Sequence, residues 1–309
     1  MAYELNDINR WAKLDPEGFA ENCDDIYKYK VETAADMIIS NMHRSPIVLL
    51  SGPSGSGKTT TAMNIEAELR NRGIYAHSIA MDNYFKTIDA STPRTPEGEL
   101  DLESPLCLDI DLLNEHFGML ARGERIFVPK YEFSRQMRIL EPSKSLRIGP
   151  NEIVIFEGIH ALNEMITSKH PGAFKLYVSA RTDISEGKTI RFKRTWIRLL
   201  RRLVRDKLFR GADAKTTLGM WANVRRGEKL YISPFKDSAN LLLDTALPYE
   251  VPVMKSFAKA MLSDISSDWE RYDEISQILP ALELFADIDA YHIKPDSLLR
   301  EFIGGSIFE

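Results

Sequence analysis

Cysteine is scarce in this chain of 309 residues, which contains only Cys23 and Cys107. Two cysteines without metal-ligand spacing exclude a disulfide framework and a cysteine zinc site, so reduced thiols are expected. The six histidines include no closely spaced pair, which argues against a histidine zinc site. No apolar run approaches the roughly 20 residues that span a bilayer. The opening Met-Ala-Tyr-Glu-Leu-Asn-Asp is too acidic for a signal peptide, so we expect a cytoplasmic protein with no membrane partner.

Other absences narrow the function. The net charge of −5 argues against wholesale nucleic-acid binding. The Asn-Lys-x-Asp signature expected of a GTPase and the Leu-Ser-Gly-Gly-Gln signature of an ABC-type ATPase do not occur. What the chain does have is a hydrophobic fraction of 44%, enough to bury a large core. Its length suits one large α/β domain with extensions, or two domains.

The chain is organised around residues 47–60, Ile-Val-Leu-Leu-Ser-Gly-Pro-Ser-Gly-Ser-Gly-Lys-Thr-Thr. They fit the spacing G-x-x-x-x-G-K-[ST], and the apolar run 47–50 supplies the strand that must precede this motif. An amphipathic helix over 58–72 is predicted to follow. The alternative is a chance glycine-serine loop, but strand, motif and helix together indicate a phosphate-binding loop.

The residue types of this loop explain how it would hold phosphate. Glycines permit backbone conformations closed to other residues, so successive N–H groups converge on phosphate oxygens at a helix N-terminus. Lys58 is expected to reach the β and γ phosphates, and the Thr59 hydroxyl to bind Mg²⁺. The residues expected to bind the nucleotide are Gly52, Ser54, Gly55, Ser56, Gly57, Lys58, Thr59 and Thr60.

Two later strands, near 76–81 and 152–156, are each followed by an acid. Strands alternating with helices predict a parallel sheet, whose carboxyl ends bind ligands, so Asp82 and Glu157 should lie beside the loop. Asp82 can accept a proton from a substrate hydroxyl or help to hold Mg²⁺, and Glu157 can serve Mg²⁺. Either acid can instead merely cap a turn.

Two further groups are candidates for an acceptor site. Asp101 and Glu103 lie two residues apart, after a predicted loop over 86–99, and such carboxylates can bind vicinal sugar hydroxyls. A solvated acidic loop is the equal alternative. Tyr131 and Phe133 end a β-prone run over 125–133 and suit stacking on a base, although core packing explains aromatic residues equally well.

A basic helix is predicted after a strand over 174–180, with Asp183 and Ser185 as capping residues. Residues 188–210 contain ten Lys or Arg residues and one acid, Asp206. Apolar residues repeat at helical spacing on one face and arginines on another. An RNA-binding face and a solvated helix are two interpretations. A lid that closes on a triphosphate is the third, and we favour it because arginines near a nucleotide site stabilise a transferring phosphoryl group.

Taken in order, these stretches resemble the uridine kinase branch of the phosphoribulokinase/uridine kinase family over about residues 45–250. The resemblance is carried by 52–60, 81–85, 101–105, 129–133, Phe-Glu-Gly-Ile at 156–159 and Arg-Arg-Leu-Val-Arg-Asp at 201–206, with Arg210 and Gly211 beyond. Tyr-Ile-Ser-Pro-Phe at 231–235 and the ending from Asp296 to Ser306 are similar to longer bacterial uridine-kinase-like nucleoside kinases. The TGS and synthetase-like region that precedes the kinase in those relatives is expected to be missing here.

The resemblance implies transfer of phosphate from ATP or GTP, with Mg²⁺, to the 5′-hydroxyl of a nucleoside. It implies that Asp82 is the general base, that Glu103 holds the ribose hydroxyls and that Glu157 is the Mg²⁺-linked acid. Together with Thr59, Asp82 and Glu157 make up the expected metal site. Catalytic roles are expected for Asp82, Lys58, Arg202 and Arg205, and Arg210 is expected at the nucleotide. The implied substrate-binding residues are Asp82, Tyr84, Glu103, Tyr131, Phe133, Gln136, Arg202 and Arg205.

Three departures from the family pattern bear on substrate. Gln136 stands where uridine kinases usually place a histidine against the base, which leaves base specificity open. Ala212 stands where another lid arginine is frequent, so one fewer phosphate contact is expected. Glu103 is one methylene longer than the usual aspartate, which shifts how the sugar sits.

We therefore predict a P-loop NTPase fold with a doubly wound, mostly parallel sheet and a helical lid. Residues 1–44 are expected to form a helical N-terminal extension, 45–264 the kinase domain, and 265–309 a helical C-terminal extension packing on it. Uridine or cytidine is the expected substrate, and a homo-oligomer is compatible with the sequence. The alternatives are a kinase of another small hydroxyl metabolite, such as ribulose 5-phosphate or pantothenate, and a weakly catalytic nucleotide sensor or RNA-binding protein.

Overall fold

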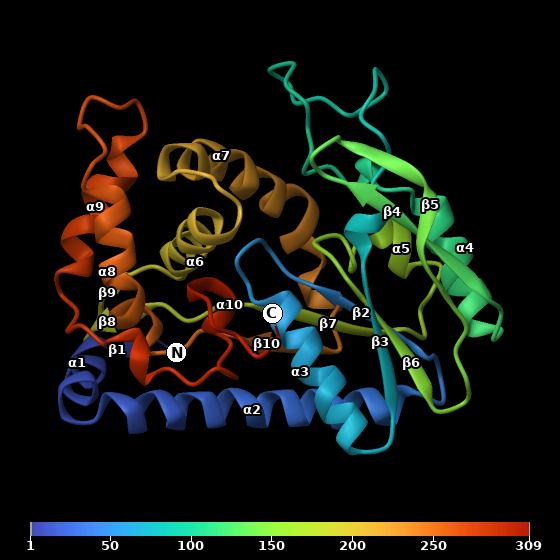
Figure 1. Ribbon diagram of the computed structural model, residues 1–309, viewed down its shortest axis with the longest axis horizontal. Coiled ribbons are helices and arrows are strands. Elements are labelled where there is room, and N and C mark those ends of the chain that lie inside the picture. Colours follow the sequence, from blue (N-terminus) through green and yellow to red (C-terminus); the bar gives the residue numbers. More distant parts are fainter. Residues whose placement is uncertain (1, 309) are drawn as a thin grey trace.

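A five-stranded parallel sheet forms the centre of the molecule (Figure 1), in a computed structural model that describes residues 2–308. The strands lie in the order β10-β7-β2-β6-β3, and every neighbouring pair is parallel. They are β2 (Ile47–Ser51), β3 (Tyr75–Ala80), β6 (Glu152–Glu157), β7 (Phe174–Ser179) and β10 (Leu241–Asp244). From β2 the chain builds β3 and β6 on one side and β7 and β10 on the other. This reversal opens a crevice at the carboxyl end of β2 and confirms the doubly wound fold.

Both faces of the sheet are buried. Side chains alternate along a strand, so Ile47 and Leu49 of β2 enter one hydrophobic core while Val48 and Leu50 enter the other. All five residues of β2 are buried, which explains why the strand reads as a continuous apolar run.

The larger core contains most of the helices. Its helices come from both ends of the chain as well as the middle: α1 (Leu5–Leu14), α2 (Pro16–Asn41), α3 (Lys58–Asn71), α6 (Arg194–Phe209), α7 (Ala214–Gly227), α8 (Glu250–Leu262), α9 (Tyr272–Leu282) and α10 (Arg300–Ile303). The long helix α2 runs beneath the sheet in Figure 1. From the carboxyl-terminal part of the chain, Trp269, Ile275, Ile278 and Leu279 pack in or against this core.

The smaller core lies on the opposite face of the sheet. It is built from η1 (Met81–Tyr84), α4 (Ile110–Ala121), α5 (Glu164–Thr167) and the antiparallel hairpin of β4 (Ile126–Glu132) and β5 (Met137–Leu146). The chain also contains the short helices η2 (Pro105–Cys107), η3 (Glu228–Ile232), η4 (Ser233–Ser238) and η5 (Ala290–His292). None of the helices among residues 2–308 is both long and apolar enough to cross a membrane.

The basic helix starts later than predicted. A hairpin of β8 (Ile184–Glu186) and β9 (Thr189–Phe192) precedes it and pairs with β1 (Tyr3–Glu4), so α6 begins at Arg194. Asp183 still accepts a hydrogen bond from the Arg194 backbone N–H, at 2.7 Å, but it does so from across this hairpin. The alternating Ile-Ser-Glu and Thr-Ile-Arg-Phe runs on either side of Gly187 were the missed signal.

A buried ion pair fixes α6 against the phosphate loop. Arg201 is fully buried, and its guanidinium donates to Glu250 of α8 at 2.6 and 3.1 Å. It also donates to the Thr245 carbonyl at 2.6 Å and to the Gly55 carbonyl at 3.3 Å. The ring of Phe302 in α10 lies 5.0 Å from the guanidinium carbon. One side chain therefore joins α6, α8, α10 and the loop after β2.

We expect Arg201→Met to lower the free energy of unfolding by about 3–5 kcal/mol, because it leaves the Glu250 carboxylate buried without a counter-charge. The double variant Arg201→Met/Glu250→Leu should recover much of this loss, since it removes both charges. Urea denaturation measures both. Arg194→Met on the exposed side of α6 is the control and should stay within about 0.5 kcal/mol of wild type. A single variant more stable than the double would contradict the assignment.

Candidate active site

The glycine-rich loop between β2 and α3 forms a tight turn at the carboxyl edge of the sheet. A Cβ at Gly52 would lie 1.9 Å from the Val178 carbonyl oxygen, so the backbone passes too close to β7 for any side chain. Gly57 has φ +81°, in the left-handed region, immediately before α3 begins at Lys58. These two constraints explain the spacing of the glycines in the sequence.

Lysine, threonine and both predicted acids meet at this loop. Asp82 from η1 and Glu157 from the end of β6 line one polar pocket with the loop, together with Arg205, Arg210 and Glu301. The Lys58 ammonium donates to the Pro53 carbonyl at 3.3 Å, and the Thr59 hydroxyl lies 3.5 Å from the Glu157 carboxylate. The sequence predicted Asp82, Glu157, Arg205 and Arg210 at this site, but not Glu301.

Burial controls the protonation of this pocket. It raises the pKa of Glu157 to about 7, an effect that the positive charge of Lys58 opposes. Burial also raises the pKa of Asp82, and the positive charge of Lys58 again opposes this effect. Burial lowers the pKa of Lys58 itself. A raised pKa lets a carboxylate take up a proton near neutral pH, which is what a general base requires.

The donor atoms suit Mg²⁺. Thr59, Glu157 and Asp82 supply hydroxyl and carboxylate oxygens, the ligands that hard divalent cations prefer. Within residues 2–308 no group of three or more acidic, His or Cys side chains could hold a metal by itself. This agrees with the usual Mg²⁺ site of phosphoryl-transfer enzymes, where one or two protein carboxylates act with the substrate phosphates.

Three arginines are held near the loop by one buried acid. Asp206, only 2% exposed, pairs with Arg202 at 3.2 Å, Arg205 at 2.9 Å and Arg210 at 3.6 Å. Arg202 also donates to the Ser54 hydroxyl at 2.8 Å, which joins it to the phosphate loop. The sequence predicted no role for Asp206. Its position as the single acid among ten basic residues in 188–210 was the feature that could have indicated one.

The lid interpretation applies to part of the basic helix only. Nine residues of α6 are buried, among them Arg198 and Arg201, which pair with Glu228 and Glu250. A movement of the whole helix would expose this core and break both buried ion pairs. A closing movement thus stays a prediction for its carboxyl end and the loop that carries Arg210, which is exposed.

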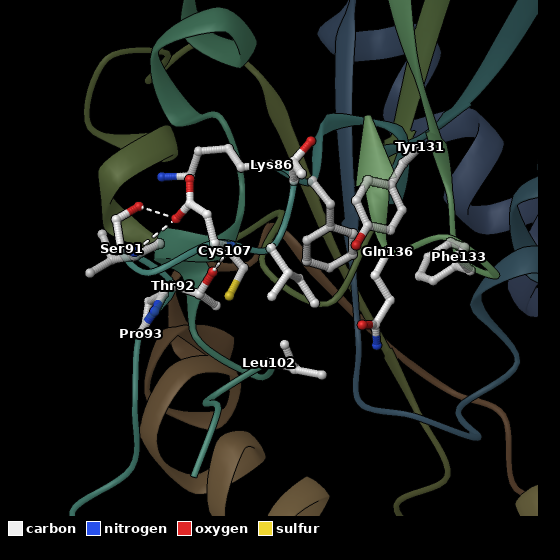
Figure 2. Close-up of a pocket in the computed structure, with 14 residues that line it drawn as sticks. Lys86, Ser91, Thr92, Pro93, Leu102, Cys107, Tyr131, Phe133 and Gln136 are labelled. Atoms are coloured by element: carbon white, nitrogen blue, oxygen red, sulfur yellow. Dashed lines mark hydrogen bonds between the residues drawn. The ribbon is translucent and has the colours of Figure 1, made fainter. Parts of the chain in front are cut away.

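The predicted aromatic residues lie together in a second, mostly apolar pocket. Figure 2 shows Tyr131, Phe133 and Gln136 on one side of it and Thr92, Pro93 and Cys107 on the other. The rings of Tyr131 and Phe133 are 5.0 Å apart, and Phe85 packs 5.6 Å from Tyr131 and 6.1 Å from Phe133. These three rings form an aromatic wall against which a planar ring can pack.

Gln136 adopts a strained backbone conformation at the turn of the β4–β5 hairpin. Its φ is +52°, the one positive φ of a residue other than glycine that the structure records over residues 2–308. Its carbonyl accepts the N–H of Ile88, which ties the turn to the loop at the opposite side of the pocket. The turn therefore presents the Gln136 side chain to the pocket.

Tyr84 corrects one of the predictions. Its side chain is fully buried in the smaller core, 2.8 Å from His116 Nδ1, so the expectation that it contacts substrate is wrong. The preceding Asp82 and the following Phe85 face the two pockets instead.

The two acids predicted to act as a pair, Asp101 and Glu103, have different surroundings. Asp101 is buried and accepts hydrogen bonds from Arg226 at 2.7 Å and Tyr231 at 2.8 Å, so it holds α7 and η3 rather than a ligand. For Glu103, burial raises the pKa to about 7, and the nearby charges of Arg202 and Lys58 oppose this. The Glu103 side chain packs against Gly227 of α7, and its contact with ribose hydroxyls stays a prediction.

Fold and site together define the class of a P-loop kinase, a nucleotide-binding phosphotransferase. The model of the phosphoribulokinase/uridine kinase family matches residues 47–250, and the chain belongs to this family. It is 30% identical over 204 residues to a uridine kinase of Staphylococcus epidermidis, covering 65% of this chain and 88% of that protein. It is 25% identical over 227 residues to a uridine kinase of Halobacterium salinarum, covering 73% and 91%.

Solved structures give a weaker likeness. One entitled "Structure of a Possible Uridine Kinase from Bacillus stearothermophilus" aligns with a TM-score of 0.45 at 14% identity, covering 70% of this chain and 97% of that one.

The pKa of Glu157 predicts how stability depends on pH. Its ordinary value is 4.5 and the folded value is about 7, so the folded protein holds a proton that the unfolded chain releases in between. The stability from this proton is fully present below about pH 4.5 and is lost as pH rises through 7. Without nucleotide or Mg²⁺, Glu157→Gln should therefore gain about 1–3 kcal/mol over wild type between pH 5 and 8.

Thermal unfolding at several pH values measures this difference. Glu124→Gln, at an exposed position, is the control, because its hydrogen bond with Arg122 lowers the pKa of that carboxyl. Its difference from wild type should stay constant between pH 6 and 8. A constant difference for Glu157→Gln as well would show that Glu157 is not protonated in the folded protein.

Proposed function

We propose that the protein transfers the γ-phosphoryl group of ATP or GTP to the 5′-hydroxyl of a nucleoside, with uridine or cytidine as the expected acceptor. One observation carries this proposal. Asp82 lies in the phosphate pocket and Phe85, three residues later, lies in the aromatic pocket. A hydroxyl next to Asp82 would belong to a molecule whose ring lies against the aromatic wall.

In this proposal the residues mainly position the reactants. The loop N–H groups and Lys58 hold the donor phosphates, and Thr59 and Glu157 hold Mg²⁺, which offsets phosphate charge when bound. Asp82 orients the acceptor hydroxyl and accepts its proton. The acceptor oxygen bonds to the γ-phosphorus as the bond to the bridging oxygen breaks, and the nucleoside diphosphate leaves. Arg202, Arg205 and Arg210 neutralise negative charge during the transfer.

The acceptor is inferred from the pocket and from the relatives. Tyr131 and Phe133 would pack on the base, Gln136 would offer it an amide donor and acceptor, and Glu103 would hold the ribose hydroxyls. The curated relatives cited above are named uridine kinases, which supports a pyrimidine nucleoside. An amide in place of the usual histidine still pairs with a polar base edge, but it carries no charge at any pH.

The test of the function is ADP formation from ATP and Mg²⁺ with a panel of nucleosides, ribulose 5-phosphate and pantothenate. We expect turnover with uridine or cytidine. Asp82→Asn should keep ATP binding nearly intact and lose roughly 10²–10⁴-fold in kcat, because the proton acceptor is removed. An Asp82→Asn variant with wild-type kcat would rule out Asp82 as the base. Turnover on another acceptor alone would replace the substrate and keep the mechanism.

A second experiment tests the aromatic pocket. Phe133→Ala should raise the KM for the nucleoside about fivefold to 30-fold, with little change in the KM for ATP, since a stacking ring contributes roughly 1–2 kcal/mol. Phe127→Ala is the matched control, because Phe127 lies on the same strand-turn unit, is similarly exposed at 59% against 62%, and does not line the pocket. Equal effects of the two variants would place the nucleoside elsewhere.

A further inference from the structure

The carboxyl-terminal segment 296–303 packs directly against the phosphate loop. In Figure 1 α10 lies beside α6 and the start of α3. A Cβ at Gly57 would lie 2.9 Å from the Leu298 side chain, so this segment closes over the loop. It is anchored by Phe302, fully buried against Arg201, and by Ser297, whose hydroxyl lies 2.7 Å from that of Tyr249.

This segment places a carboxylate among the phosphate-binding groups. Glu301 lines the same pocket as Lys58, Asp82 and Glu157. Its Oε2 accepts the backbone N–H of Thr60 at 3.2 Å. The negative charge of Glu301 acts to raise the pKa of both Lys58 and Glu157, because the three groups lie near one another.

The N–H that Glu301 occupies is one that α3 leaves without an internal partner. The helix begins at Lys58 with Gly57 as its N-cap, which has no side chain to cap it, and its first turn contains no acid. The N–H groups of that turn are therefore free for an anion. In a phosphate-binding loop that anion is a phosphate oxygen, and a carboxylate oxygen has the same charge and hydrogen-bonding capacity.

We propose that Glu301 is a built-in competitor for the donor nucleotide. In the ligand-free protein its carboxylate takes the Thr60 N–H, and a nucleotide phosphate must displace it to use the same donor. The inference rests on the proposed function, because it requires nucleotide to bind at this loop. It assigns to the Asp296–Ser306 motif a role in setting donor affinity, whereas a plain helix cap would affect stability only.

Glu301→Gln separates the two roles, because the amide oxygen can still accept the N–H while the negative charge is gone. We expect ATP to bind the variant on the order of tenfold more tightly than wild type, which corresponds to about 1.4 kcal/mol, since a neutral amide holds the N–H less strongly than a carboxylate does. We also expect a lower melting temperature for the ligand-free variant, from the weaker cap. Isothermal titration with ATP and Mg²⁺ measures the affinity.

Two control variants define the outcomes. Asp296→Asn removes the same charge from an exposed position on the same segment and should bind ATP like wild type. Lys58→Ala should weaken binding and so confirms that the titration reports on the loop. If wild type binds ATP and Glu301→Gln binds it no more tightly than Asp296→Asn, the inference fails alone. If neither wild type nor Glu301→Gln binds ATP, the proposed function fails and takes the inference with it.

A measurement on the wild-type protein covers the case of an unfolded variant. Hydrogen exchange of the peptide 296–304 should become faster when ATP binds, because the segment loses its bond to Thr60. Slower exchange would mean that Glu301 stays in place beside the nucleotide, and would overturn the inference.

Discussion

The buried guanidinium of Arg201 is the constraint on which the other features of the site depend. It bonds the Gly55 carbonyl, the loop after β10 and Glu250 of α8, and it packs on Phe302 of the carboxyl-terminal segment. A buried charge holds its neighbours firmly, because each broken bond would leave a polar group unpaired away from water. The phosphate loop, α6 and α10 are therefore fixed relative to one another, and this arrangement brings Arg205 and Glu301 to one pocket.

That pocket is electrically balanced before any ligand arrives. Lys58, Arg205 and Arg210 face Asp82, Glu157 and Glu301, so three positive and three acidic groups share a partly desolvated space. Burial disfavours each charge, and the raised pKa of Glu157 and of Asp82 and the lowered pKa of Lys58 follow from it. A triphosphate with Mg²⁺ would redistribute these charges. Of the three acids, Glu301 is the one that we expect the triphosphate to displace.

The aromatic pocket is organised by shape more than by charge. Phe85, Tyr131 and Phe133 come from two elements that meet because Gln136 turns the hairpin back toward the loop at Ile88. The aromatic wall continues directly from the segment that carries Asp82. The short stretch Asp82–Phe85 therefore links the phosphate pocket to the aromatic pocket, with Tyr84 anchoring it in the core.

The phosphate loop, four of the five strands of the sheet and the positions of Asp82 and Glu157 follow from the amino-acid sequence alone, because each depends on short-range patterns of glycine, apolar runs and strand ends. The fifth strand, β10, was not predicted. The prediction from sequence misplaced the start of the basic helix, because the alternating runs of β8 and β9 are only three and four residues long and were not recognised as strands. Only the tertiary structure decided that Tyr84 is buried, that Asp101 and Asp206 hold arginines, and that Glu301 reaches Thr60. These facts are contacts between residues as far apart as 60 and 301, and such contacts arise from packing that no local pattern encodes.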